Sequence, residues 1–244
     1  MTTAFKDLGA FILSLENSGR LKHVTAAVDK DWEIACIARW VAECINEEDL
    51  FALQFDHVTG YQVPVVVGLY ASRALYARAL NETPTELLSR WSHALENPCK
   101  PIAISSAPVM QIIQTGDAVN LLGIPVPVWT PGRDGGPYIP SASIITKDPE
   151  TGVQNMGVYR VQIHDGQTAG LFFGTQAQHG AMHYAKSCRR NESMPVAIVI
   201  GGPPAVNFAA AAKTAYGVDE LEIAGGLAGA GIEVVSGATV DLLI

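Results

Sequence analysis

The stretch from Ser143 to Arg160, SIITKDPETGVQNMGVYR, predicts two antiparallel strands joined by a short turn. The β-branched run at 144–146 is typical of a first strand. Asp148 and Pro149 start the turn and Gly152 completes it, because Asp-Pro favours turns and glycine tolerates a positive φ. We therefore expect residues 153–161 to return as the second strand.

One side chain of the returning strand needs an explanation. Side chains alternate between the two faces of a strand, so Arg160 should share a face with Met156 and Val158, while Asn155 lies on the opposite face. The simplest interpretation is an edge-strand arginine that extends into solvent. The alternative is an arginine directed into an apolar face to meet a ligand.

Composition limits the class of protein. With 244 residues, 48% of them hydrophobic and 16% charged, the chain can bury a large core and leaves little room for long disordered segments. The net charge of −8 argues against a nucleic-acid partner, because no basic stripe is present to neutralise phosphates.

No stretch predicts a membrane span or a secretory signal. The longest uncharged segment, 194–212, contains Gly201, Gly202, Pro203 and Pro204, which suit a strand, a turn and a helix better than a span. The cysteines form no C-x-x-C pair, so reduced thiols in a cytoplasmic protein are expected.

Periodicity divides the chain into two parts. Helices and strands alternate up to about residue 100, and shorter strands with many turns follow, so we expect an α/β fold with domains at 1–110 and 111–244. Expected helices lie at 7–18, 32–45, 72–80, 83–96, 180–190 and 205–213. Expected strands outside the hairpin lie at 21–28, 50–55, 63–69, 170–173, 196–200, 232–235 and 240–244.

Two motifs suggest chemistry that their context does not support. His179 and His183 have zinc-ligand spacing, but the glutamate of H-E-x-x-H is missing between them. The run from Gly225 to Gly231 lacks the G-x-G-x-x-G order and follows an acidic helical stretch, so we interpret it as a tight helix-to-strand connection.

A mixed set of polar residues remains near the predicted second domain. Each taken alone suits a surface or capping position, but a carboxylate, an imidazole and an amide oxygen together could bind Mn²⁺ or Mg²⁺. The set comprises Asn155, Arg160, Gln178, His179, Asp219 and Glu220.

Several motifs in this order resemble the UbiD family of prenylated-FMN-dependent decarboxylases. They are ITKDPETGVQNMGVYR, Gln178-His179-Gly180, PVAIVIGGPPA and YGVDELEIAGGLAG, preceded by DLGAFILSLENSGRL. The similarity covers essentially the whole chain, and several motifs in order are far more specific than any one of them. The resemblance implies a small α/β domain followed by a flavin-reductase-like split β-barrel with flanking helices.

The resemblance also implies roles for individual residues. Asn155, His179 and Glu220 would bind Mn²⁺, or Mg²⁺, and through it the flavin phosphate, with K⁺ as a further candidate ion. Gly157 and Val158 would present backbone to the prenylated FMN, and Gln178 would contact it. Arg160 would contact flavin and the substrate carboxylate as the catalytic residue, which its planar fork suits.

The activity implied is reversible decarboxylation of an aromatic or α,β-unsaturated acid. A flavin prenyltransferase would supply the cofactor, and a homo-oligomer or a partner subunit is expected. The family's two acidic residues for proton transfer lie downstream of the segment matched here, so this chain is expected to be incomplete for catalysis. The alternative is a non-catalytic flavin-binding or assembly subunit of a multi-subunit decarboxylase.

These roles make one demand on the backbone. Asn155 and Arg160 can serve one site only if the strand between them is irregular, so we expect a bulge or a barrel corner near Gly157. A flat, regular strand would contradict the site.

Overall fold

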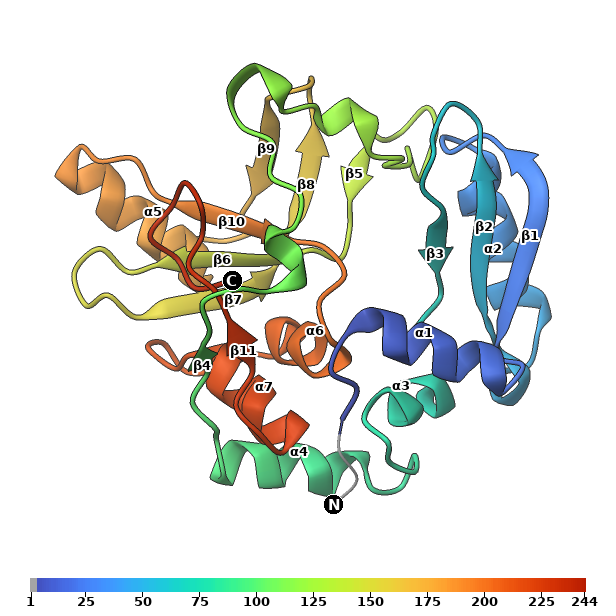
Figure 1. The fold of residues 1–244 in the computed structure, drawn as a ribbon, viewed down its shortest axis with the longest axis horizontal. Helices are drawn as coiled ribbons and strands as arrows, with labels where there is room; N and C mark the ends of the chain where they lie inside the picture. Colours follow the sequence, from blue (N-terminus) through green and yellow to red (C-terminus); the bar gives the residue numbers. More distant parts are fainter. Residues whose placement is uncertain (1–3) are drawn as a thin grey trace.

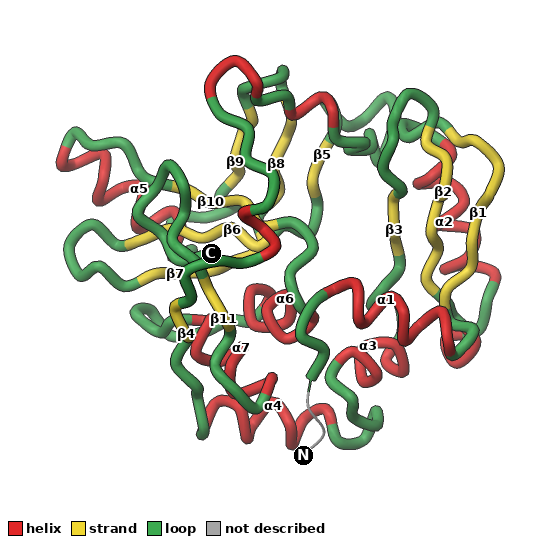
Figure 2. The backbone as a smooth tube through the Cα atoms, in the orientation of Figure 1, coloured by secondary structure: helices red, strands yellow, loops and turns green. Residues whose placement is uncertain are grey.

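The computed structural model describes residues 4–244 as a mixed α/β fold (Figures 1 and 2). The α-helices are α1 (Leu8–Asn17), α2 (Glu33–Cys44), α3 (Arg73–Ala79), α4 (Leu87–Glu96), α5 (His179–Arg190), α6 (Pro204–Ala211) and α7 (Glu220–Ala228). The strands are β1 (Leu21–Val28), β2 (Ala52–Val58), β3 (Val65–Val67), β4 (Ile102–Ala103), β5 (Tyr138–Ile139), β6 (Ser143–Lys147), β7 (Gln154–Val158), β8 (Arg160–Ile163), β9 (Ala169–Phe172), β10 (Val196–Val199) and β11 (Glu233–Val234). Short 3-10 helices lie at Glu47–Asp49, Pro108–Met110, Gly116–Ala118 and Leu121–Gly123.

The first sheet has the order β1-β2-β3, with β1 parallel to β2 and β2 antiparallel to β3. Helix α2 covers one face, where Ile34 packs with Leu53 and Phe55. Leu21 and Ala52 belong instead to a larger core that α1 and α3 share with α6 and α7. The expected alternation of helices and strands in this part is confirmed.

The predicted hairpin forms the centre of a second sheet, with the order β10-β6-β7. Strands β6 and β7 pair from Ser143 opposite Val158 to Lys147 opposite Gln154. The turn closes through a hydrogen bond from the Asp148 amide to the Val153 carbonyl, 2.9 Å, and Gly152 has a φ of 76°. The turn chemistry of the sequence therefore set the register of the hairpin.

The chain turns a corner at Tyr159, between β7 and β8. Strand β7 pairs with β6, whereas β8 joins a third sheet with the order β5-β8-β9 (Figure 1). The expected irregularity is confirmed, two residues beyond Gly157. The corner also corrects one expectation: Met156 is buried in the main core, but Arg160 is exposed on another sheet and does not share its apolar face.

Helix α7 packs through its glycines against α4 and the segment that follows it. A Cβ atom on Gly225 would lie 2.3 Å from the Cys99 carbonyl oxygen, and one on Gly226 would lie 2.7 Å from that of Ala94. The prediction that residues 225–231 form only a connection is thus wrong for its first half. Glycine is used there for close helix packing, and the helix ends only before Gly229, whose φ is 78°.

The C-terminal residues also differ from expectation. A strand at 240–244 was expected, but these residues contribute only an isolated bridge between Ser236 and Leu243, while β11 pairs in parallel with β4. Leu242 is still buried in the main core, which explains the apolar pattern.

Two wider expectations can be compared with this fold. The mixed α/β class is confirmed, while the split barrel stays a prediction, because the strands of residues 4–244 form separate small sheets and no closed barrel. The division at residues 110 and 111 also stays a prediction. Within the described residues, no helix is both long and apolar enough to cross a membrane.

Candidate functional site

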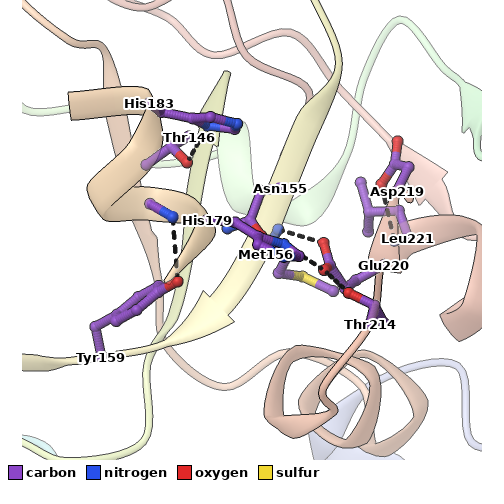
Figure 3. Close-up of polar contacts among 11 residues, drawn as sticks. Thr146, Asn155, Met156, Tyr159, His179, His183, Thr214, Asp219, Glu220 and Leu221 are labelled. Carbon is purple, nitrogen blue, oxygen red and sulfur yellow. Dashed lines mark hydrogen bonds and ion pairs between the residues drawn. The ribbon is translucent and has the colours of Figure 1, made fainter. Parts of the chain in front are cut away.

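The site is built around a buried carboxylate at the start of α7. Glu220 is 2% exposed, and its two oxygens accept hydrogen bonds from the Met156 amide (2.7 Å) and the Thr214 hydroxyl (2.6 Å) (Figure 3). A buried carboxylate is stable only when it is hydrogen-bonded or paired with a cation. These contacts tie α7 to the middle of β7.

Two further polar side chains converge on Glu220. His179 is the first residue of α5, and its Nδ1 lies 3.1 Å from Oδ1 of Asn155 on β7. The same Nδ1 lies 3.9 Å from Oε1 of Glu220. Three potential ligands from three elements therefore face one point, as the sequence predicted for this set (Figure 3).

The donor set fits a hard divalent cation. Neighbouring ligands at about 2.1 Å from an octahedral ion lie about 3.0 Å apart, so separations of 3.1 and 3.9 Å need only small adjustments. Asn155 is 5% exposed, and among residues 4–244 its amide nitrogen has no hydrogen-bond partner. One end of this amide is thus free for an added group whichever way it is turned. No three His, Cys, Asp or Glu side chains cluster for a metal in the described part, so a three-ligand set at this point would have to include the amide.

Two candidates from the sequence lie apart from this point. Asp219 caps α7 by accepting a hydrogen bond from the Leu221 amide, 2.9 Å, and burial raises its pKa to about 6. His183 is 3% exposed and bonds Thr146, with 2.9 Å between Nδ1 and Oγ1, and burial lowers its pKa. His179 and His183 therefore serve different partners and form no zinc pair.

The residues expected to contact the flavin line β7 and the corner beyond it. Gly157 has no room for a side chain, since a Cβ atom would lie 2.6 Å from the Tyr159 ring. Val158 is 37% exposed, and Gln178 lies directly before α5, where its Oε1 accepts a hydrogen bond from the Thr175 amide, 3.4 Å. These positions stay predictions as flavin contacts.

Arg160 is held by an aromatic ring across the third sheet. Its guanidinium carbon lies 5.4 Å from the centroid of the Phe172 ring, and the two residues are directly paired between β8 and β9. Such a cation–π contact orients the guanidinium and leaves its hydrogen-bonding edge available.

Sequence reasoning missed several groups that shape the site. Thr214 and the Met156 amide bind Glu220, and the Tyr159 hydroxyl accepts a bond from the Gly180 amide at the start of α5, 3.4 Å. Thr214 is six residues before Glu220 and Met156 is next to Asn155, but no motif marks either one. Only the meeting of β7 with the α6–α7 loop makes them partners.

A cleft of about 850 Å³ lies beside this site and shares Thr214 with it. Lys147, Lys213, Asp219 and Glu222 are among its lining residues, whereas Asn155, Arg160, Gln178 and His179 are not. Its volume alone gives no reason to place the chemistry there.

Both parts of the chain match models of one protein family. Residues 101–244 match the model of the UbiD Rift-related domain, described as 3-octaprenyl-4-hydroxybenzoate carboxy-lyase, and residues 12–95 match the N-terminal domain model of the same family. The chain belongs to the UbiD family.

Individual UbiD relatives extend this similarity to solved structures. The chain is 34% identical to the UbiD-class enzyme HmfF of Pelotomaculum thermopropionicum, solved with prFMN, with a TM-score of 0.89 over 98% of this chain and 55% of that one. For the vanillic acid decarboxylase ShVdcCD of Sedimentibacter hydroxybenzoicus the identity is 27% and the TM-score 0.92, over 99% and 52% of the chains. A phenolic acid decarboxylase of Streptomyces sp. strain D7 is 31% identical, over 93% of this chain and 49% of the relative. The chain thus spans about half the length of the UbiD relatives it matches.

Proposed function

We propose that this chain carries the prenylated-FMN and Mn²⁺ site of a UbiD decarboxylase that acts reversibly on an aromatic or α,β-unsaturated carboxylic acid. The observation that carries the proposal is the convergence of Asn155, His179 and Glu220 on one point. The flavin-bound relative HmfF and the two decarboxylases supply the class of cofactor and reaction. In this proposal residues 111–244 bind the cofactor and residues 1–110 form the domain that precedes it.

A metal ion held by these ligands would balance the negative charge of the flavin phosphate. The chain has a net charge of −8, so a flavin phosphate needs a local cation, and a divalent ion is the strongest one available. Glu220 would supply the anionic ligand, while the Met156 amide and the Thr214 hydroxyl keep its carboxylate oriented. Mg²⁺ could replace Mn²⁺ on the same oxygen-rich ligands, and K⁺ is a further candidate ion.

Arg160 would hold the substrate. Its guanidinium matches a carboxylate with two parallel hydrogen bonds, and Phe172 leaves that edge open. When bound, prenylated FMN supplies an electron sink for decarboxylation. Gly157, against which the Tyr159 ring packs, would present its backbone to the flavin between metal and arginine, and Gln178 would add a polar contact at the start of α5. We assign no proton donor within this chain.

The partners follow from the same proposal. A flavin prenyltransferase supplies the cofactor, and a homo-oligomer or a partner subunit completes the enzyme. The alternative, a flavin-binding or assembly subunit without its own activity, predicts cofactor binding but no turnover with any supplied partner. The half-length match to the UbiD relatives is the observation that keeps this alternative open.

The test is co-expression with a flavin prenyltransferase, followed by mass spectrometry of the released cofactor and metal analysis. We expect prenylated FMN and about one Mn²⁺ per chain in the wild type. Asn155→Ala and Glu220→Ala should lose flavin and metal together, because each removes a ligand. Glu43→Ala, on the exposed face of α2, is the matched control. Unchanged occupancy in both ligand variants would refute the metal site, and a wild type without flavin would refute the proposal.

A further inference from the structure

An aromatic side chain outside the proposed ligand set packs directly on His179. Tyr216 lies in the loop between α6 and α7, and its ring meets the His179 ring edge to face, with centroids 5.2 Å apart and an interplanar angle of 90°. The same ring meets His183 at 5.9 Å and 73°. Tyr216 therefore touches both imidazoles at the start of α5.

The Tyr216 hydroxyl is anchored to a buried carboxylate. It donates a hydrogen bond of 2.5 Å to Oδ2 of Asp148, which is 1% exposed and begins the hairpin turn. Lys186 of α5 donates to the same oxygen at 2.7 Å, and the Glu150 amide donates to Oδ1 at 2.9 Å. Although burial opposes ionisation, these hydrogen bonds lower the pKa of Asp148 well below its ordinary value. The anchor is thus a fixed negative charge.

A second contact holds the ring from its face. The Lys186 ammonium lies 5.4 Å from the centroid of the Tyr216 ring, so one cation contacts both the anchor and the ring. The hairpin turn, α5 and the α6–α7 loop therefore meet at Tyr216. The ring position follows from these three elements and not from the loop alone.

His179 needs such a support. Its side chain is 18% exposed, and only Nδ1 faces Asn155 and Glu220. Rotation of the imidazole by half a turn would replace that nitrogen with carbon. The edge-to-face contact with Tyr216 favours one ring orientation, and such contacts contribute about 0.5–1.5 kcal/mol beyond burial.

We infer that Tyr216, anchored by Asp148 and Lys186, is a positioning residue that fixes the His179 imidazole for metal binding. This inference rests on the proposed metal site and assigns a role to a residue outside it. Tyr216 is 42% exposed, so a purely structural role predicts a small loss of stability and no change in metal affinity. The two roles can therefore be separated.

The experiment is a Mn²⁺ titration of the metal-free full chain, followed by electron paramagnetic resonance of the unbound ion. Tyr216→Leu removes ring and anchor and should weaken Mn²⁺ binding roughly 10-fold, the usual lower range for a partner of a metal ligand. Tyr216→Phe keeps the ring but loses the hydrogen bond to Asp148. Its Mn²⁺ affinity should therefore lie between those of Tyr216→Leu and the wild type. Tyr184→Leu is the control, since Tyr184 is an exposed tyrosine on α5. Glu220→Gln is the reference variant, which shows how far Mn²⁺ binding weakens when a proposed ligand is lost.

A second measurement does not depend on metal. Histidine side-chain NMR of the metal-free protein should show a changed tautomer balance for His179 in both Tyr216 variants and the wild-type balance in Tyr184→Leu. If Tyr216→Leu folds poorly, the NMR measurement on Tyr216→Phe still tests the positioning role, because that variant loses only a hydroxyl group.

Each outcome has one meaning. If the wild type and Glu220→Gln bind Mn²⁺ differently while Tyr216→Leu matches the wild type, the positioning role is overturned and the metal site stands. If Tyr184→Leu weakens binding as much as Tyr216→Leu, general loosening explains the effect and the inference is overturned. If the wild type binds no Mn²⁺, both the metal site and the inference are overturned.

Discussion

Replacement of Glu220 separates its structural role from its role as a ligand. In the metal-free protein the carboxylate accepts one hydrogen bond from the buried Met156 amide and one from the Thr214 hydroxyl. Glu220→Gln keeps one oxygen for the amide, and the Thr214 hydroxyl can turn to accept from the new NH₂ group. Glu220→Ala leaves the Met156 amide without a partner in a buried position.

The magnitudes follow from this difference. An unpaired buried donor costs about 1–3 kcal/mol, and a replaced hydrogen bond changes little. Glu220→Ala should therefore lower the free energy of unfolding by about 2–3 kcal/mol, and Glu220→Gln by about 1 kcal/mol or less. Both variants should lose Mn²⁺, since neither keeps the anionic ligand.

Urea unfolding of the metal-free chain, with Glu43→Ala as the control, measures the first effect. Equal losses in the two Glu220 variants would refute the reasoning, because the amide would then not depend on the glutamate. Tight Mn²⁺ binding by Glu220→Gln would instead remove Glu220 from the ligand set.

Three further predictions concern the corner, the helix contact and the hairpin turn. Arg160→Ala should abolish decarboxylation in the complete enzyme but leave Mn²⁺ content unchanged, and near-normal turnover would contradict its role. Gly226→Ala should lower the free energy of unfolding by about 3 kcal/mol through overpacking against Ala94 of α4, whereas Gly9→Ala, at an exposed position of α1, should change it by less than about 1 kcal/mol; similar values would disprove the tight α4–α7 contact. The pKa of Asp148 is lowered in the folded state, so its stabilisation is complete above the ordinary pKa of 3.8 and is lost as the pH falls further. Lys186→Met should destabilise the protein at pH 7 in urea unfolding, and this destabilisation should shrink below pH 4; a constant difference would contradict the ion pair.

Local chemistry made most elements predictable. The hairpin followed from Asp148, Pro149 and Gly152, since turn type depends on a few adjacent residues. Helix α1 followed from apolar spacing, and the structure adds that Asp7 caps it by accepting a hydrogen bond from the Ala10 amide, 2.7 Å. The run after Gly225 was misinterpreted because a helix rich in glycine is unfavourable by itself and becomes favourable only against α4.

The site was predictable as a set of residue types. Amide, imidazole and carboxylate in family order indicated Asn155, His179 and Glu220, and the structure brings all three together. Residue type alone did not separate Asp219 from Glu220, because adjacent carboxylates at a helix start differ only in the direction of their side chains; the family resemblance was what singled out Glu220. The fold assigns Asp219 to the cap and Glu220 to the site.

Sequence alone predicted the hairpin of Ser143–Lys147 with Gln154–Val158, its turn, and a break near Gly157. Only the tertiary structure decided that the break is a corner at Tyr159, where the strand leaves one sheet for another and Arg160 moves off the face of Met156. Likewise, only the fold brings Tyr216 from the α6–α7 loop onto His179. Local sequence governs turns and strand propensity, whereas a change of sheet and a contact between distant loops depend on packing that no single segment encodes.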